Sequence, residues 1–197
     1  MTTTLPWSAG RWLNPPAAVE ERDGDLLVTA VEKSDAWRRT SYGFIVDTAH
    51  ALLAPFEQNT AVEVDMTAAF TDNFDQAGIM VRVDAENWVK AGVEFSDGTC
   101  QLGAVVTAGS SDWSVAPVPD WQGKRVRIRV SRKGDALTMR AGRISPDGTA
   151  ALHMVRLLPF PENAVAQAGP FLCAPSRAGL TVPFHAWRVT EADTSLH

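Results

Sequence analysis

Polar and aromatic side chains occupy alternate positions in two neighbouring segments of the chain. These residues are Gln76, Arg82, Trp88, Lys90 and Glu94, and the same series of alternate positions also holds Gly78, Met80 and Gly92. The positions between them are mostly apolar, so the alternation predicts two strands, each with one apolar face and one polar face. An indole ring can stack on the apolar face of a sugar, while amide, carboxylate and cationic groups can bond its hydroxyl groups. The pattern therefore predicts a ligand-binding surface on one face of a sheet.

A third strand joins this surface through the Asp97-Gly98 pair, which favours a two-residue type I′ hairpin. Such a turn pairs Ser96 with Thr99 and places Glu94 opposite Gln101. The apolar face then continues without interruption into the third strand, so propensity, pattern and turn chemistry agree on one register.

The turn between the first two strands needs an odd number of residues if the apolar face is to stay on one side. A five-residue loop pairs Gly78 with Gly92, whereas a three-residue loop sets Arg82 opposite Lys90. We favour the longer loop because it avoids two cations face to face. Gly78, Gly92 and Gly103 then form a row across three strands. Glycine inside a strand often marks the close approach of a ligand or of another backbone segment, so the row is either a ligand trough or a packing feature.

Two further segments, "AWRRTSYGF" and "SSDWS", offer aromatic residues for the rim of the surface. A single tryptophan is more often buried in a core than exposed at a binding site. Several aromatic residues together with polar residues on one face are what favour a ligand-binding surface. Arg82 and Lys90 would favour an anionic ligand such as a sugar phosphate. The predicted ligand-binding residues are Gln76, Arg82, Trp88, Lys90, Glu94, Gln101, Trp37, Tyr42 and Trp113.

Short alternating segments separated by turn signals must position these side chains, and helical periodicity is nearly absent. This arrangement predicts an all-β sandwich. No stretch has the character of a linker, so we expect a single domain over residues 1–197 with its core at about 7–190. The expected strands lie near 17–22, 25–31, 51–54, 60–70, 76–84, 88–96, 99–107, 113–116, 124–132, 135–143, 149–156, 165–173 and 182–190.

Composition excludes several classes of function. The net charge of −5 argues against nucleic-acid binding, and the densest basic run, residues 123–133, alternates with Val and Ile like a half-buried strand. The first 16 residues do not have the pattern of a signal peptide, and no apolar segment is long enough to span a membrane. We therefore expect a cytoplasmic protein without a membrane or nucleic-acid partner. Its two cysteines, Cys100 and Cys173, are expected to be buried thiols.

Catalytic and metal-binding patterns are weak. The four histidines lack ligand spacing, and the acidic loop at 70–76 is typical of turn chemistry rather than calcium binding. No nucleophile elbow or phosphate-binding loop is present. Glu94 lies near Lys90, where an ion pair is a commoner role than acid catalysis. We therefore predict no catalytic residues, no metal and no cofactor.

Longer stretches of the chain resemble a known family. They are "DQAGIMVRVDAENWVKAGVEFSDG" (75–98), "VVTAGSSDWSV" (105–115), "RWLNPP" (11–16) and "WRRTSYGFIVDTAHAL" (37–52). They resemble domain-of-unknown-function family 1349, which includes relatives of the yeast regulation-of-enolase protein. The resemblance implies a concanavalin A-like jelly-roll sandwich of two antiparallel sheets, one of them concave, and it implies no established reaction.

The resemblance also bears on a hydrolase. Laminarinase-like enzymes of this fold carry a Glu-x-Asp-x-x-Glu strand, whereas here Glu63 and Asp65 are followed by Ala68. Three functions remain open. The first is a non-catalytic binding module whose concave polar and aromatic site takes a carbohydrate or sugar phosphate. The second is a regulatory protein-interaction domain that acts on a metabolic enzyme, and the third and least favoured is a glycoside hydrolase.

Overall fold

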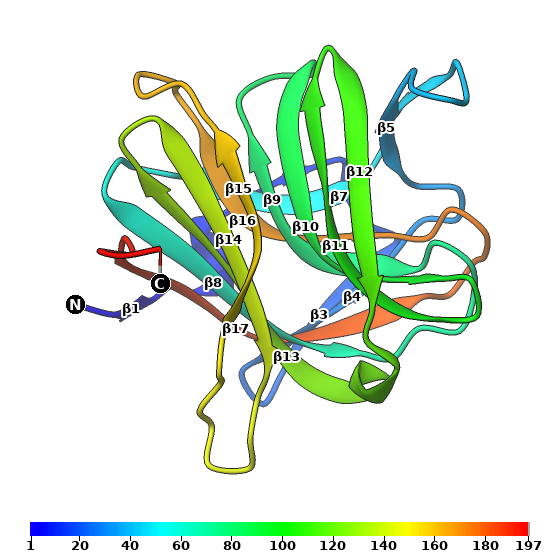
Figure 1. Cartoon of the computed structure of the whole chain (residues 1–197). Coiled ribbons are helices and arrows are strands. Elements are labelled where there is room, and N and C mark those ends of the chain that lie inside the picture. Colours follow the sequence, from blue (N-terminus) through cyan, green and yellow to red (C-terminus); the bar gives the residue numbers. More distant parts are fainter. Residues whose placement is uncertain (197) are drawn as a thin grey trace.

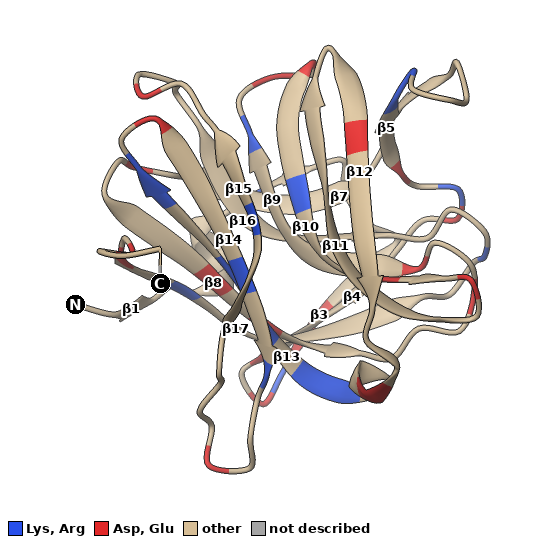
Figure 2. Cartoon of the chain, in the orientation of Figure 1, with Lys and Arg blue, Asp and Glu red and all other residues tan. Residues whose placement is uncertain are grey.

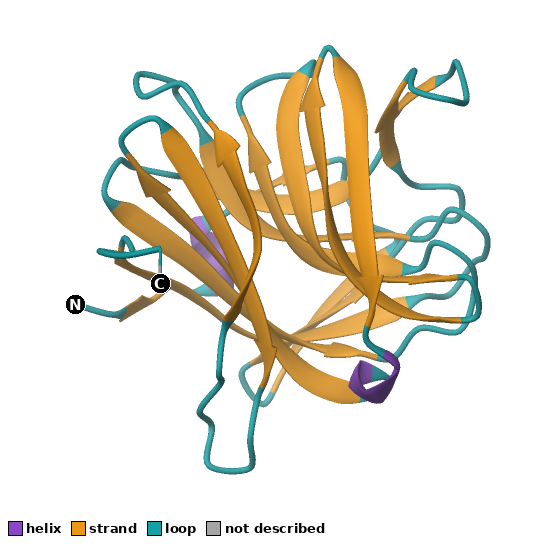
Figure 3. Ribbon diagram, in the orientation of Figure 1, coloured by secondary structure: helices purple, strands orange, loops and turns teal. Residues whose placement is uncertain are grey.

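The computed structural model describes residues 1–196, and strands make up most of them (Figures 1 and 3). Within that range the helical elements are two single turns of 3₁₀ helix, η1 (Trp7–Ala9) and η2 (Pro119–Trp121). Neither is long or apolar enough to cross a bilayer. The strands form two large antiparallel sheets and one separate two-stranded hairpin.

The first large sheet, here sheet A, has eight strands. Their order is β15 (His153–Pro159), β14 (Ala136–Arg143), β13 (Lys124–Lys133), β8 (Thr60–Ala68), β17 (Thr181–Glu191), β4 (Asp25–Thr29) and β3 (Ala18–Arg22), with β1 (Thr3–Thr4) paired to β17. The second, sheet B, has seven strands. Their order is β12 (Ser110–Pro117), β11 (Thr99–Ala108), β10 (Asn87–Ser96), β9 (Gln76–Arg82), β16 (Gln167–Cys173), β7 (His50–Pro55) and β2 (Arg11–Leu13). The hairpin consists of β5 (Ala36–Arg38) and β6 (Ile45–Asp47).

Each strand expected from the sequence overlaps an observed strand. The strand expected at residues 149–156 begins and ends later than predicted, at His153–Pro159. Between the turn at Gly148 and His153 the chain makes one isolated bridge, from Ala150 to Ile144. The short strands β1, β2, β5 and β6 were missed, since two or three residues are too few to show an alternating pattern.

The main core lies between the two sheets. It draws alternate residues from facing strands, for example Val64 and Met66 of β8 and Ala91 and Val93 of β10. This settles the orientation of β8, which the sequence left open: its even-numbered residues face the core, and Glu63 is on the opposite face.

The predicted register of the central hairpins is confirmed. Ser96 pairs with Thr99, and both turn residues between them have positive φ angles, 53° and 76°, as a type I′ turn requires. The preceding loop has five residues, so Gly78 pairs with Gly92 and Gly92 pairs with Gly103.

The outer face of sheet A carries paired charges. Arg127 binds Asp65 through two hydrogen bonds of 2.7 and 2.9 Å, and Arg188 donates to the same carboxylate at 2.9 Å. Basic segments of β13 and β14 lie beside the acidic segment of β8 in Figure 2. The basic run at 123–133 therefore belongs to a strand whose arginines are paired with neighbouring acids, as at Arg129 and Glu63, 2.8 Å apart.

The outer face of sheet B is partly covered by the segment that contains the β5–β6 hairpin. This segment packs Ala36 and Trp37 onto sheet residues that include Met80, Trp88 and Phe171, and together they form a second, smaller apolar cluster. In Figure 1 the hairpin stands beside the edge strand β12. Sheet and hairpin together enclose the candidate site.

Candidate functional site

A cavity of about 250 Å³ lies between the outer face of sheet B and the β5–β6 segment. Its lining comes from strands of sheet B, from strand β5 and from four loops: Asp35, Trp37, Tyr42, Phe44, Phe74, Gln76, Lys90, Glu94, Val105, Trp113 and Pro175.

The floor of the cavity follows from the pleat of the sheet. Lys90 and Glu94 lie four residues apart on β10 and therefore point to the same side. Glu94 pairs with Gln76 of β9, and Lys90 pairs with Val105 of β11. Val105 in turn pairs with Trp113 of β12, so adjacent strands bring these five side chains onto one face.

Aromatic rings form one wall. The ring of Trp37 contacts Tyr42 and Trp113 edge to face, with centroid distances of 5.6 and 6.5 Å, and Tyr42 stacks on Phe44 at 5.5 Å. The indole nitrogen of Trp37 donates to the carbonyl of Thr40 at 3.0 Å, which fixes that ring. Tyr42 is 58% exposed and Trp113 38% exposed, so both keep free ring surface at the cavity.

Lys90 is the buried cation of the floor. Its Nζ lies 3.0 Å from Oδ1 of Asp35, and the residue is only 3% exposed. Burial is the largest single influence and lowers the pKa of Lys90, but the attraction and hydrogen bond of Asp35, together with smaller effects of Cys173 and Glu94, outweigh it, so the pKa is raised. Lys90 therefore stays protonated and acts as a fixed positive charge paired with Asp35.

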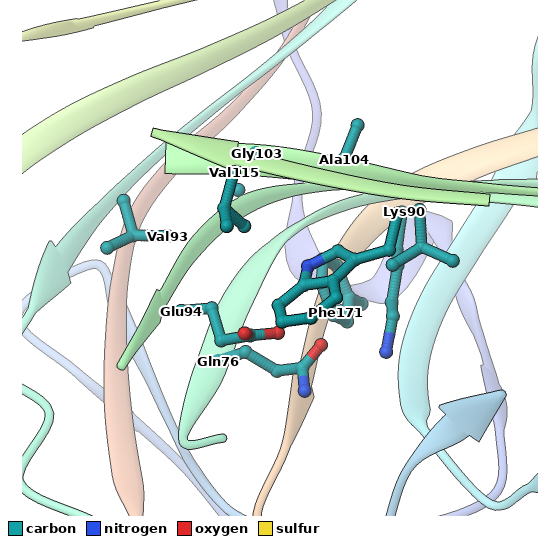
Figure 4. A pocket seen from close by; sticks show the side chains of 11 residues that line it. Gln76, Lys90, Val93, Glu94, Gly103, Ala104, Val115 and Phe171 are labelled. Atoms are coloured by element: carbon teal, nitrogen blue, oxygen red, sulfur yellow. The ribbon is translucent and has the colours of Figure 1, made fainter. Parts of the chain in front are cut away.

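Glu94 has the opposite character. Burial is the main reason that the pKa of Glu94 is raised to about 7. The positive charge of Lys90 lowers this pKa, and the negative charge of Asp35 raises it. Its Oε1 is buried and has no hydrogen-bond partner among residues 1–196. Figure 4 shows the carboxylate of Glu94 close to the amide of Gln76, the residue with which it pairs across β10 and β9. Glu94 can therefore donate or accept a hydrogen bond near neutral pH.

Six of the nine predicted binding residues surround this cavity: Gln76, Lys90, Glu94, Trp37, Tyr42 and Trp113. The other three do not line it. Trp88 is 1% exposed and belongs to the apolar cluster beneath the hairpin. Gln101 is buried near the β10–β11 turn, and its amide donates to the carbonyl of Ser96 at 3.5 Å.

Arg82, the third, holds the hairpin instead. Its guanidinium binds both oxygens of Asp47 on β6, at 2.8 and 2.7 Å. The expectation that Arg82 and Lys90 favour an anionic ligand is therefore wrong, because each cation is already neutralised by a carboxylate. A phosphate in this cavity would meet Asp35 without a free cation from these two residues.

The glycine row is explained by strand packing. A Cβ atom on Gly78 would lie 2.0 Å from the carbonyl oxygen of Ala91, and one on Gly92 would lie 2.1 Å from that of Ala77. Neither position tolerates a side chain without a backbone shift. The space above the row is about 20 Å³, which is room for about one water molecule. The row thus permits close strand contact, and the ligand-sized space lies beside it.

Sequence reasoning missed the loop residues Asp35, Phe44, Phe74 and Pro175. Phe74 has a φ angle of 68°, a left-handed conformation that is rare for a bulky side chain and often marks a functional site. No periodic pattern indicates such residues, because loops follow no regular alternation.

The acidic side chains of residues 70–76 and the two cysteines have structural roles. In the acidic loop, the carboxylate of Asp75 is buried and accepts hydrogen bonds of 2.9 and 2.7 Å from Arg177. No cluster of three or more His, Cys, Asp or Glu side chains suited to a metal ion occurs in the described part of the chain. Cys100 and Cys173 are free and buried, as expected.

Two antiparallel sheets with this strand order define a concanavalin A-like jelly-roll sandwich, and its outer face carries a partly aromatic cavity. The chain belongs to the family described as "Protein of unknown function (DUF1349)", whose family model matches residues 12–192. It is 38% identical to "Regulation of enolase protein 1" of Saccharomyces cerevisiae over 183 residues, which cover 93% of this chain and 90% of the yeast protein.

Solved structures agree with the fold. The crystal structure of a functionally unknown protein from Saccharomyces cerevisiae matches with a TM-score of 0.86 and 36% identity, covering 96% of this chain and 100% of the other. Lectin I-B4 from Griffonia simplicifolia matches with a TM-score of 0.56 and 17% identity, over 96% of this chain and 98% of the lectin. At that identity the lectin is evidence for the fold alone.

Proposed function

We propose that this chain is a non-catalytic binding domain and that the cavity on sheet B takes one ring of a carbohydrate. One observation carries the proposal. Four aromatic side chains are exposed among residues 1–196, and all of them line this one cavity: Tyr42, Phe44, Phe74 and Trp113. Exposed aromatic rings gathered around a concave site are typical of ligand recognition rather than of a solvated surface.

The polar groups of the floor suit a hydroxylated ring. Gln76 offers an amide, and Glu94 offers an oxygen that no residue in the described chain bonds. Saccharides combine apolar ring faces with hydroxyl groups that both donate and accept, so a site for them needs rings and polar side chains together. The volume of about 250 Å³ lies just below the range of about 300–1,000 Å³ typical of drug-sized ligands, which favours a single ring.

Titration calorimetry with a panel of monosaccharides and short glycans, both neutral and amino-bearing, tests this proposal. Trp113→Ala removes an exposed ring at the cavity and should weaken binding of any hit at least tenfold. Leu157→Ala is a matched control, since Leu157 is an exposed apolar residue on β15 of the other sheet. A panel without a single binder, or a hit whose affinity is the same in Trp113→Ala, would count against the carbohydrate site.

A second candidate is a regulatory domain that binds a metabolic enzyme. The name of the similar yeast protein, "Regulation of enolase protein 1", favours it. The exposed side chains of Tyr42, Phe44 and Ile45 on and beside the β5–β6 hairpin would offer an apolar contact surface. Purified enolase from the same organism should then bind the wild-type chain in sedimentation velocity, and the double variant Tyr42→Ala, Phe44→Ala should not bind. No association with enolase at micromolar concentrations would remove this candidate.

A further inference from the structure

The cavity holds two carboxylates against one ammonium group. Asp35 uses Oδ1 to bind Lys90 at 3.0 Å and the amide of Ala36 at 2.7 Å, so the charge of Lys90 is already matched. Glu94 contributes a second carboxylate, whose buried Oε1 is unbonded within residues 1–196. When both acids are ionised, these three groups carry a net charge of −1 inside a partly desolvated space.

Neighbouring cations do not correct this imbalance. Arg82 is paired with Asp47, and Arg38 is paired with Glu86 at 2.6 Å. Other groups that act on Glu94 are Lys90 and the Ser96 hydroxyl on its own strand, Asp35 from the segment before β5 and Asp97 in the β10–β11 turn. The thiol of Cys173 on β16 faces the same cluster, and burial raises the pKa of this thiol, so it remains neutral. Within residues 1–196, Glu94 therefore has only the shared Lys90 as a positive neighbour.

Aromatic rings complete an environment suited to a cation. The two indoles of Trp37 and Trp113 stand edge to face, and the rings of Tyr42, Phe44 and Phe74 also line the space. The face of an aromatic ring attracts cations, and tryptophan does so most strongly. Several rings around one cavity, with a carboxylate that has an unbonded oxygen, are the usual composition of a site that binds an ammonium group.

We infer that the ligand of this cavity carries an ammonium group, which pairs with Glu94 and is held between the aromatic rings. This inference rests on the proposed binding function and narrows it, because it selects amino-bearing sugars over neutral ones. Binding of such a ligand requires ionised Glu94. A proton therefore leaves Glu94 when the ligand binds below pH 7, and affinity for a permanently charged ligand rises with pH.

Two matched pairs of probes test the charge. D-glucosamine and D-glucose share a ring and differ at one amino group, while choline and 3,3-dimethylbutan-1-ol share a shape and differ in charge. Titration calorimetry at pH 7 should give at least tenfold tighter binding for the charged member of each pair. For choline, whose charge does not change with pH, affinity should rise about tenfold from pH 6 to pH 8, since a group with a pKa of about 7 goes from about one-eleventh to about ten-elevenths ionised.

Glu94→Gln keeps the shape of the side chain and removes its charge, so it should abolish the preference for the charged probes and the pH dependence. Asp112→Asn is the control: it removes an acid on β12 that does not line the cavity, and it should change neither property. Circular dichroism establishes that both variants fold. If Glu94→Gln does not fold, the pH series on the wild-type chain decides the question alone.

The outcomes separate the two proposals. Equal binding of glucose and glucosamine overturns the ammonium inference and leaves the carbohydrate function standing. Binding of choline but of no sugar supports the ammonium inference and removes the carbohydrate function. A preference for charged probes that survives in Glu94→Gln overturns the role of Glu94, and no binding of any probe overturns both.

Discussion

Replacing Glu94 with glutamine should make the stability of the protein less dependent on pH. The pKa of Glu94 is raised from 4.5 to about 7 in the folded chain, mainly by burial. Between these two values the unfolded chain loses the proton while the folded chain keeps it. Glu94 therefore favours folding below about pH 4.5, and this contribution is lost as the pH rises through about 7. With 1.36 kcal/mol for each pKa unit, the loss is about 3 kcal/mol.

Glutamine does not titrate, so the difference in unfolding free energy between Glu94→Gln and wild type isolates this one group. Urea denaturation at intervals from pH 4.5 to pH 8 should show the variant gaining about 3 kcal/mol relative to wild type across the range. In thermal melts the same gain corresponds to roughly 6–12 °C for a chain of this size. The control Asp112→Asn should show no comparable trend. A difference between Glu94→Gln and wild type that stays constant with pH would refute the raised pKa of Glu94.

Two further changes test the floor of the cavity. Lys90→Met should lower the free energy of unfolding by about 3 kcal/mol in urea denaturation, because it leaves the carboxylate of Asp35 without its partner. Adding Asp35→Asn should recover much of that loss. A double variant no more stable than Lys90→Met would contradict the pairing. Gly92→Ala should lower the free energy of unfolding by about 1–3 kcal/mol, because its Cβ would meet the carbonyl oxygen of Ala77 at 2.1 Å. An unchanged free energy of unfolding in the same assay would show that the glycine row is not a packing requirement.

The sequence predicts the floor of the site well, because strand register depends on local signals. Alternation of apolar residues and the turn at Asp97-Gly98 were enough to pair Glu94 with Gln101 and Gly92 with Gly103. These signals act over a few residues and agree with one another, so few alternative registers compete.

The wall of the site could not be predicted in the same way. Asp35 binds Lys90 from 55 positions away, and nothing near either residue in the sequence indicates that contact. Alternation correctly places Arg82 and Trp88 on the outer face of sheet B, but it does not reveal that the hairpin covers them. Which tryptophan stays exposed depends on tertiary contacts, and for this reason Trp113 lines the cavity and Trp88 does not.

The β5–β6 hairpin separates the wall of the cavity from the stability of the sandwich. It pairs with neither large sheet, and polar links such as Arg82 to Asp47 join it to sheet B. Substitutions at its exposed turn, residues 39–44, would alter one wall of the cavity without disturbing the core between the sheets. The shape of this wall and the stability of the sandwich therefore depend on separate parts of the chain.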